Sequence, residues 1–186
     1  MVRKPSWPKR IQKAEEELEK EPFKSKEKIR EMVLACLNDN NIRGTAILVK
    51  PEEIDYETIM NNNQTNGEGH IIWIEFVNKG HVAVVGAGKD IGFPINKNSA
   101  TAFLLSKFED IDWDKESLII VPIRNLDKRS YGIKYVENIL QCRNGVEHYI
   151  GEYLIEHGVP ILNYFSHKNY SDKFWERCKK NNYNLK

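Results

Sequence analysis

The sequence has few cysteines and no long apolar run, and both absences exclude classes of protein. Its three cysteines, Cys36, Cys142 and Cys178, lie far apart and form no CxxC pair. This pattern is typical of neither a disulfide framework nor a thiolate zinc site. No apolar stretch approaches the ~20 residues that span a bilayer, and the basic N-terminus runs into charged sequence without the apolar core of a signal peptide. We therefore expect a cytoplasmic protein with reduced thiols and no membrane contact.

The sequence also lacks an excess of either charge. Lys and Arg total 28 and Asp and Glu total 27, a net charge of +1. This balance neither predicts nor excludes a nucleic acid partner, because a basic face can be present within a neutral total. Lysines are concentrated in residues 1–30 and 168–186. The length of 186 residues and the hydrophobic content of 40% predict one well-buried core.

The hydrophobic pattern predicts an α+β fold in a single domain of residues 1–186. Its parts are N-terminal helices within 1–40, a sheet core at 45–126 and a C-terminal helical part at 132–186. Helical spacing of apolar residues and runs of β-branched residues assign the elements. We expect helices near 8–20, 29–37, 52–60, 99–108, 132–141, 146–157 and 173–180, and strands at 45–49, 71–77, 81–85, 118–123 and 160–165.

Residues 71–85 contain the strongest local signal, which is that of a β-hairpin. Two runs of strand-forming residues flank the short sequence Asn-Lys-Gly at 78–80, and a glycine-containing turn of this length is typical of a hairpin. Apolar residues on both faces predict that the hairpin is central in a small mixed sheet, covered on both sides by the flanking helices. With a two-residue turn at 79–80, the register places His70 opposite Lys89.

This register gathers polar side chains at the open end of the hairpin. Glu68 then lies beside Lys89 and Asp90, although the two strands separate them in the sequence. Carboxylates can hold Mg²⁺, and a lysine can orient or deprotonate a water beside the metal. We expect Glu68, Lys89 and Asp90 to be catalytic, and Glu68, Asp90 and Glu75 to be candidate Mg²⁺ ligands. Glu75 is the one charge within an apolar strand, so it needs a basic partner or a metal. The alternative interpretation is that the hairpin-end residues are solvated and have no chemical role.

The order of helix, strand, hairpin, helix and strand resembles the core of the PD-(D/E)xK nucleases, which include many type II restriction enzymes. The resemblance covers about residues 45–126. In that superfamily an acidic residue opens the second strand and (D/E)xK closes the third. The triplet Ala-Gly-Lys at 87–89 takes the latter position here, so the resemblance implies Mg²⁺-dependent hydrolysis of phosphodiesters. The sequence departs from the family at Ala87, where an acid is expected, and Asp90 or Glu68 would have to replace that ligand.

The C-terminal part combines aromatic and basic residues, which can stack on bases and contact phosphates. The candidate nucleic-acid contacts are Lys173, Arg177, Lys179 and Lys180. In the alternative interpretation these lysines and the arginine only solvate the last helix.

Two further motifs are weaker. Residues 82–88 resemble the strand and glycine turn of a dinucleotide-binding domain, but Pro94 prevents a helix where that domain needs one. His148 and Glu152 have a helical spacing that suits a metal. The apolar side of their helix predicts, however, that the pair faces solvent.

Two classes of function therefore remain. The first is a metal-dependent, nuclease-like protein that acts on or binds nucleic acid, and the topology and Lys89 favour it. The second is a non-enzymatic immunity or phage-type inhibitor protein that binds a protein partner, and the missing acid at Ala87 favours it. Binding of a divalent metal distinguishes them, because only the enzyme requires it.

Overall fold

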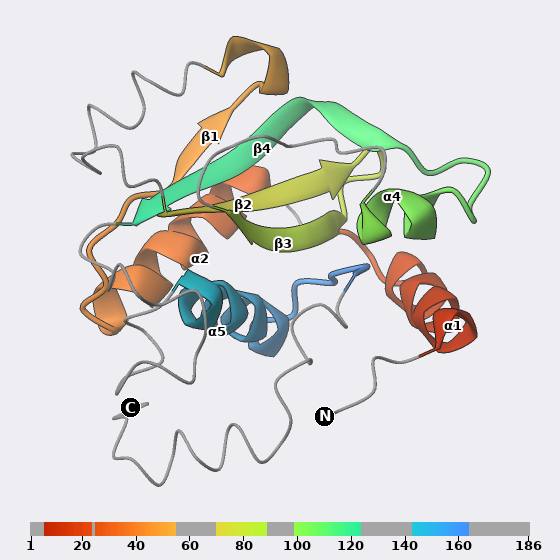
Figure 1. Cartoon of the computed structure of the whole chain (residues 1–186), viewed down its shortest axis with the longest axis horizontal. Helices are drawn as coiled ribbons and strands as arrows, with labels where there is room; N and C mark the ends of the chain where they lie inside the picture. Colours follow the sequence, from red (N-terminus) through yellow and green to blue (C-terminus); the bar gives the residue numbers. More distant parts are fainter. Residues whose placement is uncertain (1–5, 24, 55–69, 89–98, 124–142, 164–186) are drawn as a thin grey trace, which may run out of the picture.

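A computed structural model describes residues 6–23, 25–54, 70–88, 99–123 and 143–163 (Figure 1). Helices and strands are present in about equal number, and the predicted α+β class with a small sheet is confirmed. The elements are α1 (Trp7–Leu18), α2 (Lys26–Asp39), β1 (Ile47–Val49), η1 (Pro51–Glu53), β2 (His70–Val77), β3 (Val82–Gly88), α4 (Ala100–Leu105), β4 (Trp113–Ile123) and α5 (Arg143–Glu156).

The four strands form one sheet in the order β1-β4-β2-β3, and every neighbouring pair is antiparallel. The hairpin strand β2 is central, as expected, whereas β3 lies at one edge of the four strands and β1 at the other. The segment that follows α5 adds to this edge. Ile161 forms a parallel bridge with Val82, and the backbone N–H of Leu162 donates to the Val82 carbonyl at 2.9 Å. This parallel bridge makes the sheet mixed, and it covers part of an edge that would otherwise expose unpaired backbone groups.

The hairpin turn contains three residues and not the two that the sequence predicted. The Val77 N–H donates to the His81 carbonyl at 2.9 Å, and the Gly80 N–H donates to the Val77 carbonyl at 2.8 Å. The loop is therefore 78–80. Gly80 has a φ of 84°, a left-handed conformation that glycine adopts at no steric cost.

A β-bulge follows the turn. Phe76 lies opposite Val82 while Glu75 lies opposite Val84, so Ala83 is an extra residue on β3. The three-residue turn shifts the pairing by one residue, and the bulge shifts it back. The rest of the hairpin consequently has the register that the sequence predicted.

The two faces of the sheet pack against different elements. On one face, Ile72, Ile74 and Phe76 of β2 pack with α2 and α5, which lie together below the sheet in Figure 1. At the turn end of the hairpin, α1 and α4 form a second apolar cluster with Val77 and Val84. A third cluster around Ile71, Leu118 and Ile120 lies on the face opposite α2 and α5. The strand β2 therefore carries apolar residues on both faces, as its sequence indicated.

Local signals set several of the helix ends. The Ser99 hydroxyl accepts a hydrogen bond from the Ala102 N–H at 3.0 Å, so Ser99 is the N-cap of α4. The Ser25 hydroxyl caps α2 in the same way. After α5, Gly158 has a φ of 82°, as expected of a residue that follows a helix.

The strand β4 begins five residues before the predicted start at Leu118. Its first part contains three charged residues, which concealed it from a search for apolar runs. Lys115 and Glu116 are exposed, and Asp114 forms an ion pair with Lys26 of α2. The Lys26 ammonium also donates to the Ser117 hydroxyl at 2.8 Å. The helices predicted at 132–141 and 173–180 lie outside the described residues.

Candidate functional site

The open end of the hairpin is a meeting point of several strand ends. Ile71 lies opposite Gly88, and His70 lies opposite Ile123, the last residue of β4. Gly44, shortly before β1, forms a bridge with Ile123 as well. This end is on the left of the sheet in Figure 1. The register that gave the predicted His70–Lys89 pair thus holds up to the last described residue of β3.

Most of the predicted site residues lie outside the described part of the chain. They are Glu68, Lys89 and Asp90 at the hairpin end and Lys173, Arg177, Lys179 and Lys180 in the C-terminal part. Their roles stay predictions. Glu68 precedes His70 by two residues, and Lys89 and Asp90 follow Gly88 directly. The register of the described strands is therefore the only structural information about this site.

Ala87, at the position where the nucleases that the sequence resembles carry an acid, packs on the face covered by helices. It lies opposite Ile72 and contacts the core formed with α2 and α5. Glu75 has the opposite orientation, because it shares the face of Ile71 and Trp73 by strand alternation. Along β2, Glu75 is three residues from Ile72, about 10 Å at the strand rise. Glu75 therefore does not stand in for an acid at position 87.

Glu75 is a buried carboxyl whose basic partner is not found among the described residues. Its exposed fraction is 7%, and no described residue hydrogen bonds to its Oε1. It lies opposite Val84 on one side and Leu118 on the other. Burial raises the pKa of Glu75 to about 7. Near neutral pH this side chain either holds a proton or carries a charge that a cation would stabilise.

The glycines of β3 have a structural explanation. A Cβ atom at Gly86 would lie 2.5 Å from Nε1 of Trp73, so glycine leaves the space that the Trp73 ring occupies. Gly86 and Gly88 are both within β3. They do not form the turn of a dinucleotide-binding domain, which agrees with the exclusion drawn from Pro94.

The helix α5 contains two titratable groups that are removed from solvent. His148 has an exposed fraction of 1%, so the prediction that it faces solvent is wrong. The reason is that α5 packs against α2 as well as against the sheet, which buries more than its apolar stripe. Burial raises the pKa of Glu147 to about 8, against the lowering effect of Arg143. Within the described residues, no three His, Cys, Asp or Glu side chains are grouped as metal ligands.

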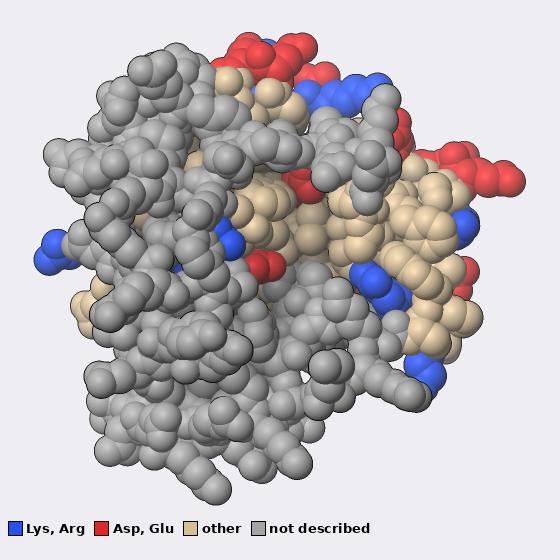
Figure 2. All heavy atoms as spheres, in the orientation of Figure 1, with Lys and Arg blue, Asp and Glu red and all other residues tan. Residues whose placement is uncertain are grey.

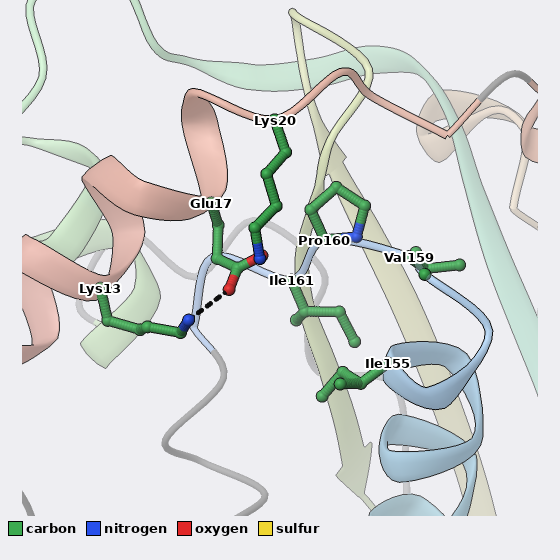
Figure 3. Close-up of a pocket in the computed structure, with 8 residues that line it drawn as sticks. Lys13, Glu17, Lys20, Ile155, Val159, Pro160 and Ile161 are labelled. Carbon is green, nitrogen blue, oxygen red and sulfur yellow. Dashed lines mark hydrogen bonds and ion pairs between the residues drawn. The ribbon is translucent and has the colours of Figure 1, made fainter.

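A cavity of about 310 Å³ lies between α1 and the end of α5 (Figure 3). Lys13, Glu17 and Lys20 line it on the α1 side, and apolar residues within 155–161 line the other side. The ammonium groups of both lysines lie 2.7 Å from the Glu17 carboxylate, and Lys13 also contacts Glu16. Glu17 therefore pairs with both lysines of the lining, whereas Glu16 does not line the cavity.

A surface feature on α1 and α4 was not predicted from the sequence. The rings of Trp7 and Phe103 meet edge to face with centroids 4.4 Å apart, and they are 36% and 44% exposed. The Arg10 guanidinium lies 4.2 Å from the centre of the Trp7 ring, and the Lys107 ammonium lies 4.2 Å from the centre of the Phe103 ring. We refer to these four residues as the aromatic–cation patch. Trp7 lies four residues before Ile11, at helical spacing, so the sequence pattern does not mark its ring as exposed.

Comparison of the chain with protein-family models, with curated proteins and with solved structures found no match. Across the described ranges, no helix is both long enough and apolar enough to cross a bilayer.

Proposed function

We propose that the protein is a metal-dependent, nuclease-like protein that hydrolyses phosphodiester bonds at the open end of the β2–β3 hairpin. The observation that supports this most is the pairing of Ile71 with Gly88. Because of this register, the segment that ends in Glu68-Gly69-His70 and the segment that begins with Lys89 adjoin neighbouring strands at one end of the sheet.

The donor set at this end suits Mg²⁺, which prefers carboxylate oxygens and keeps several waters. Asp90 and Glu68 would hold the ion, since Ala87 supplies no ligand. The metal would supply Lewis-acid polarisation of the phosphate and a more acidic water. Lys89 would orient the attacking water and hold the phosphate oxygens by charge. Glu75 is on the opposite face of the sheet from Ala87, so we assign it no role in the same ion site.

The proposal is tested by incubating the pure protein with plasmid, single-stranded DNA and RNA in the presence of Mg²⁺ or Mn²⁺. We expect cleavage that Lys89→Ala abolishes. The matched control is Lys79→Ala, because Lys79 is exposed in the turn at the other end of the same hairpin. Cleavage that survives Lys89→Ala, or that Lys79→Ala reduces equally, would contradict the assignment.

Metal binding gives a second, independent measurement. Isothermal titration with Mn²⁺ should show a site that Asp90→Ala and Glu68→Ala weaken. Glu116→Ala is the control, since Glu116 is exposed on β4 away from the open end. Equal binding by all variants would remove the ion from the hairpin end.

The second candidate function is a non-enzymatic inhibitor or immunity protein that acts through a protein partner. The observation that favours it is Ala87, which packs against the core where the related nucleases carry an acid. This function requires no metal. A chain that binds neither Mg²⁺ nor Mn²⁺ and cleaves no substrate would move the assignment to this class.

A further inference from the structure

The cations of the aromatic–cation patch contact rings and not carboxylates. Among the described residues, no Asp or Glu lies within ion-pair distance of Arg10 or Lys107, whereas other basic residues, such as Lys13 on α1, are paired with acids. The positive charge of the patch is therefore not neutralised within the described chain. A cation that lies on an aromatic ring keeps its attraction for an anion that approaches from outside.

Arg10 fixes the geometry of the patch. Its exposed fraction is 8%, its Nη2 donates to the Asn163 Oδ1 at 2.7 Å, and the Asn163 Nδ2 donates to the Thr101 hydroxyl at 2.7 Å. This chain of hydrogen bonds joins α1 to α4 through the segment that follows α5. No described residue accepts from the Arg10 Nε, and burial lowers the pKa of Arg10.

The two rings are consequently held in place before any ligand arrives. Trp7 is in contact with both Arg10 and Phe103, and its ring is still 36% exposed. A ring that is already ordered loses little conformational freedom when a ligand stacks on it. Trp7 and Phe103 are also the large apolar side chains that are exposed in the described chain, whereas the others are buried or half-buried. In Figure 2 the right-hand side of the molecule, where α1 and α4 lie, is mostly uncharged with separate basic groups and a few acidic ones.

Exposed rings beside unneutralised cations fit a ligand that has flat apolar faces and a negative backbone. We infer that the aromatic–cation patch binds single-stranded nucleic acid, with bases stacked on Trp7 and Phe103 and phosphates attracted by Lys107 and Arg10. A duplex fits less well, because its bases are already stacked and offer no free face. The patch lies at the turn end of the hairpin and is separate from the proposed hydrolytic site at the open end. Its binding requires no metal.

The test is fluorescence anisotropy of a labelled oligothymidylate titrated with the full chain in EDTA, so that no hydrolysis occurs. Phe103→Ala and Trp7→Ala should each weaken binding by about 5- to 150-fold, the range that the loss of one stacked base predicts. Phe103→Tyr should keep wild-type affinity because it keeps the ring. Lys107→Gln tests the attraction of the phosphates. Its charge control is Lys115→Gln, since Lys115 is exposed on β4. Thermal unfolding of each variant checks that the fold is retained.

Three outcomes overturn the inference. They are wild-type affinity in Phe103→Ala, absence of binding by the wild type, and equally tight binding of heparin, a polyanion without bases. Failure here is distinguishable from failure of the proposed function. Lys89→Ala should bind the oligonucleotide as the wild type does while losing cleavage, and Phe103→Ala should lose binding in EDTA whatever the outcome of the cleavage assay.

Discussion

Replacement of Glu75 by glutamine should remove a pH dependence of folding stability. The pKa of Glu75 is about 7 in the folded chain and has an ordinary value of 4.5. Below pH 4.5 the carboxyl is protonated in both states, and the folded state has its full stability. Between pH 4.5 and 7 the unfolded chain releases this proton while the folded chain keeps it, so the free energy of unfolding falls. Above pH 7 both states are ionised, and the loss levels off.

The size of this loss follows from the separation of the two pKa values. A separation of one pKa unit corresponds to about 1.36 kcal/mol of stability, so the separation between the folded and unfolded pKa values corresponds to about 3 kcal/mol. Glu75→Gln does not titrate, so its stability relative to the wild type should rise by about that amount between pH 4.5 and 8. Glutamine brings a buried amide whose unmet hydrogen bonds cost free energy. That cost is the same at both pH values and cancels in the comparison.

The assay is urea unfolding followed by tryptophan fluorescence at pH 4.5, 6 and 8. Other carboxyls, such as Glu147, titrate in both proteins. Their effect on stability therefore cancels in the difference between wild type and variant. Glu116→Gln, at an exposed position on β4, should show no such difference. A difference between Glu75→Gln and the wild type that stays constant from pH 4.5 to 8 would refute the buried state, with no basic partner among the described residues, that we assign to Glu75.

Three smaller perturbations follow from packing and hydrogen bonds, and chemical denaturation measures all of them. Gly86→Ala should destabilise the chain by about 1–3 kcal/mol because its Cβ overlaps the Trp73 ring. Adding Trp73→Leu to the same chain should relieve most of this loss. If the stability losses of the two substitutions simply add in the double variant, the overlap is ruled out. Ser99→Ala removes the N-cap of α4 and should cost about 1 kcal/mol, whereas an unchanged midpoint would show that the cap contributes nothing. Asn163→Ala leaves Arg10 without its buried acceptor and should cost about 1–3 kcal/mol, more than Asn163→Asp; equal losses in the two variants would contradict this role.

The hairpin shows which structural features the sequence predicts and which it does not. Runs of strand-forming residues and a glycine turn identify both strands, and the pairing at the open end is correct. It is correct because two deviations cancel, the longer turn at 78–80 and the extra residue Ala83. Neither deviation has a local signal, because turn length and bulge position depend on how β3 packs against its neighbours. Register at a distance from the turn was therefore predictable, and the geometry of the turn was not.

Other features depended on tertiary contacts that no local pattern reports. The first part of β4 was missed because its charged residues do not join a core: Lys115 and Glu116 are exposed, and Asp114 pairs with Lys26 of α2. His148 was assigned to solvent from a helical wheel, yet α5 is covered on more than one side. Glu75 was recognised as an unusual charge in an apolar strand. The face of the sheet that Glu75 occupies relative to Ala87 became clear only from the pairing of Ala87 with Ile72.

For the same reason, no single segment of the sequence predicts the aromatic–cation patch. Trp7 and Phe103 belong to different helices, and their contact requires α1 and α4 to lie side by side. The sequence predicts nucleic-acid contacts at Lys173, Arg177, Lys179 and Lys180, which lie outside the described residues. Exposed rings are recognised only after the core residues are known.

The central claim is the hydrolytic site at the open end of the β2–β3 hairpin. Its most direct test is cleavage of single-stranded DNA, plasmid and RNA by the wild type, Lys89→Ala and Lys79→Ala in Mg²⁺ or Mn²⁺. The account predicts metal-dependent cleavage by the wild type and Lys79→Ala and none by Lys89→Ala. Absence of cleavage by the wild type, or equal cleavage by all three proteins, would contradict it.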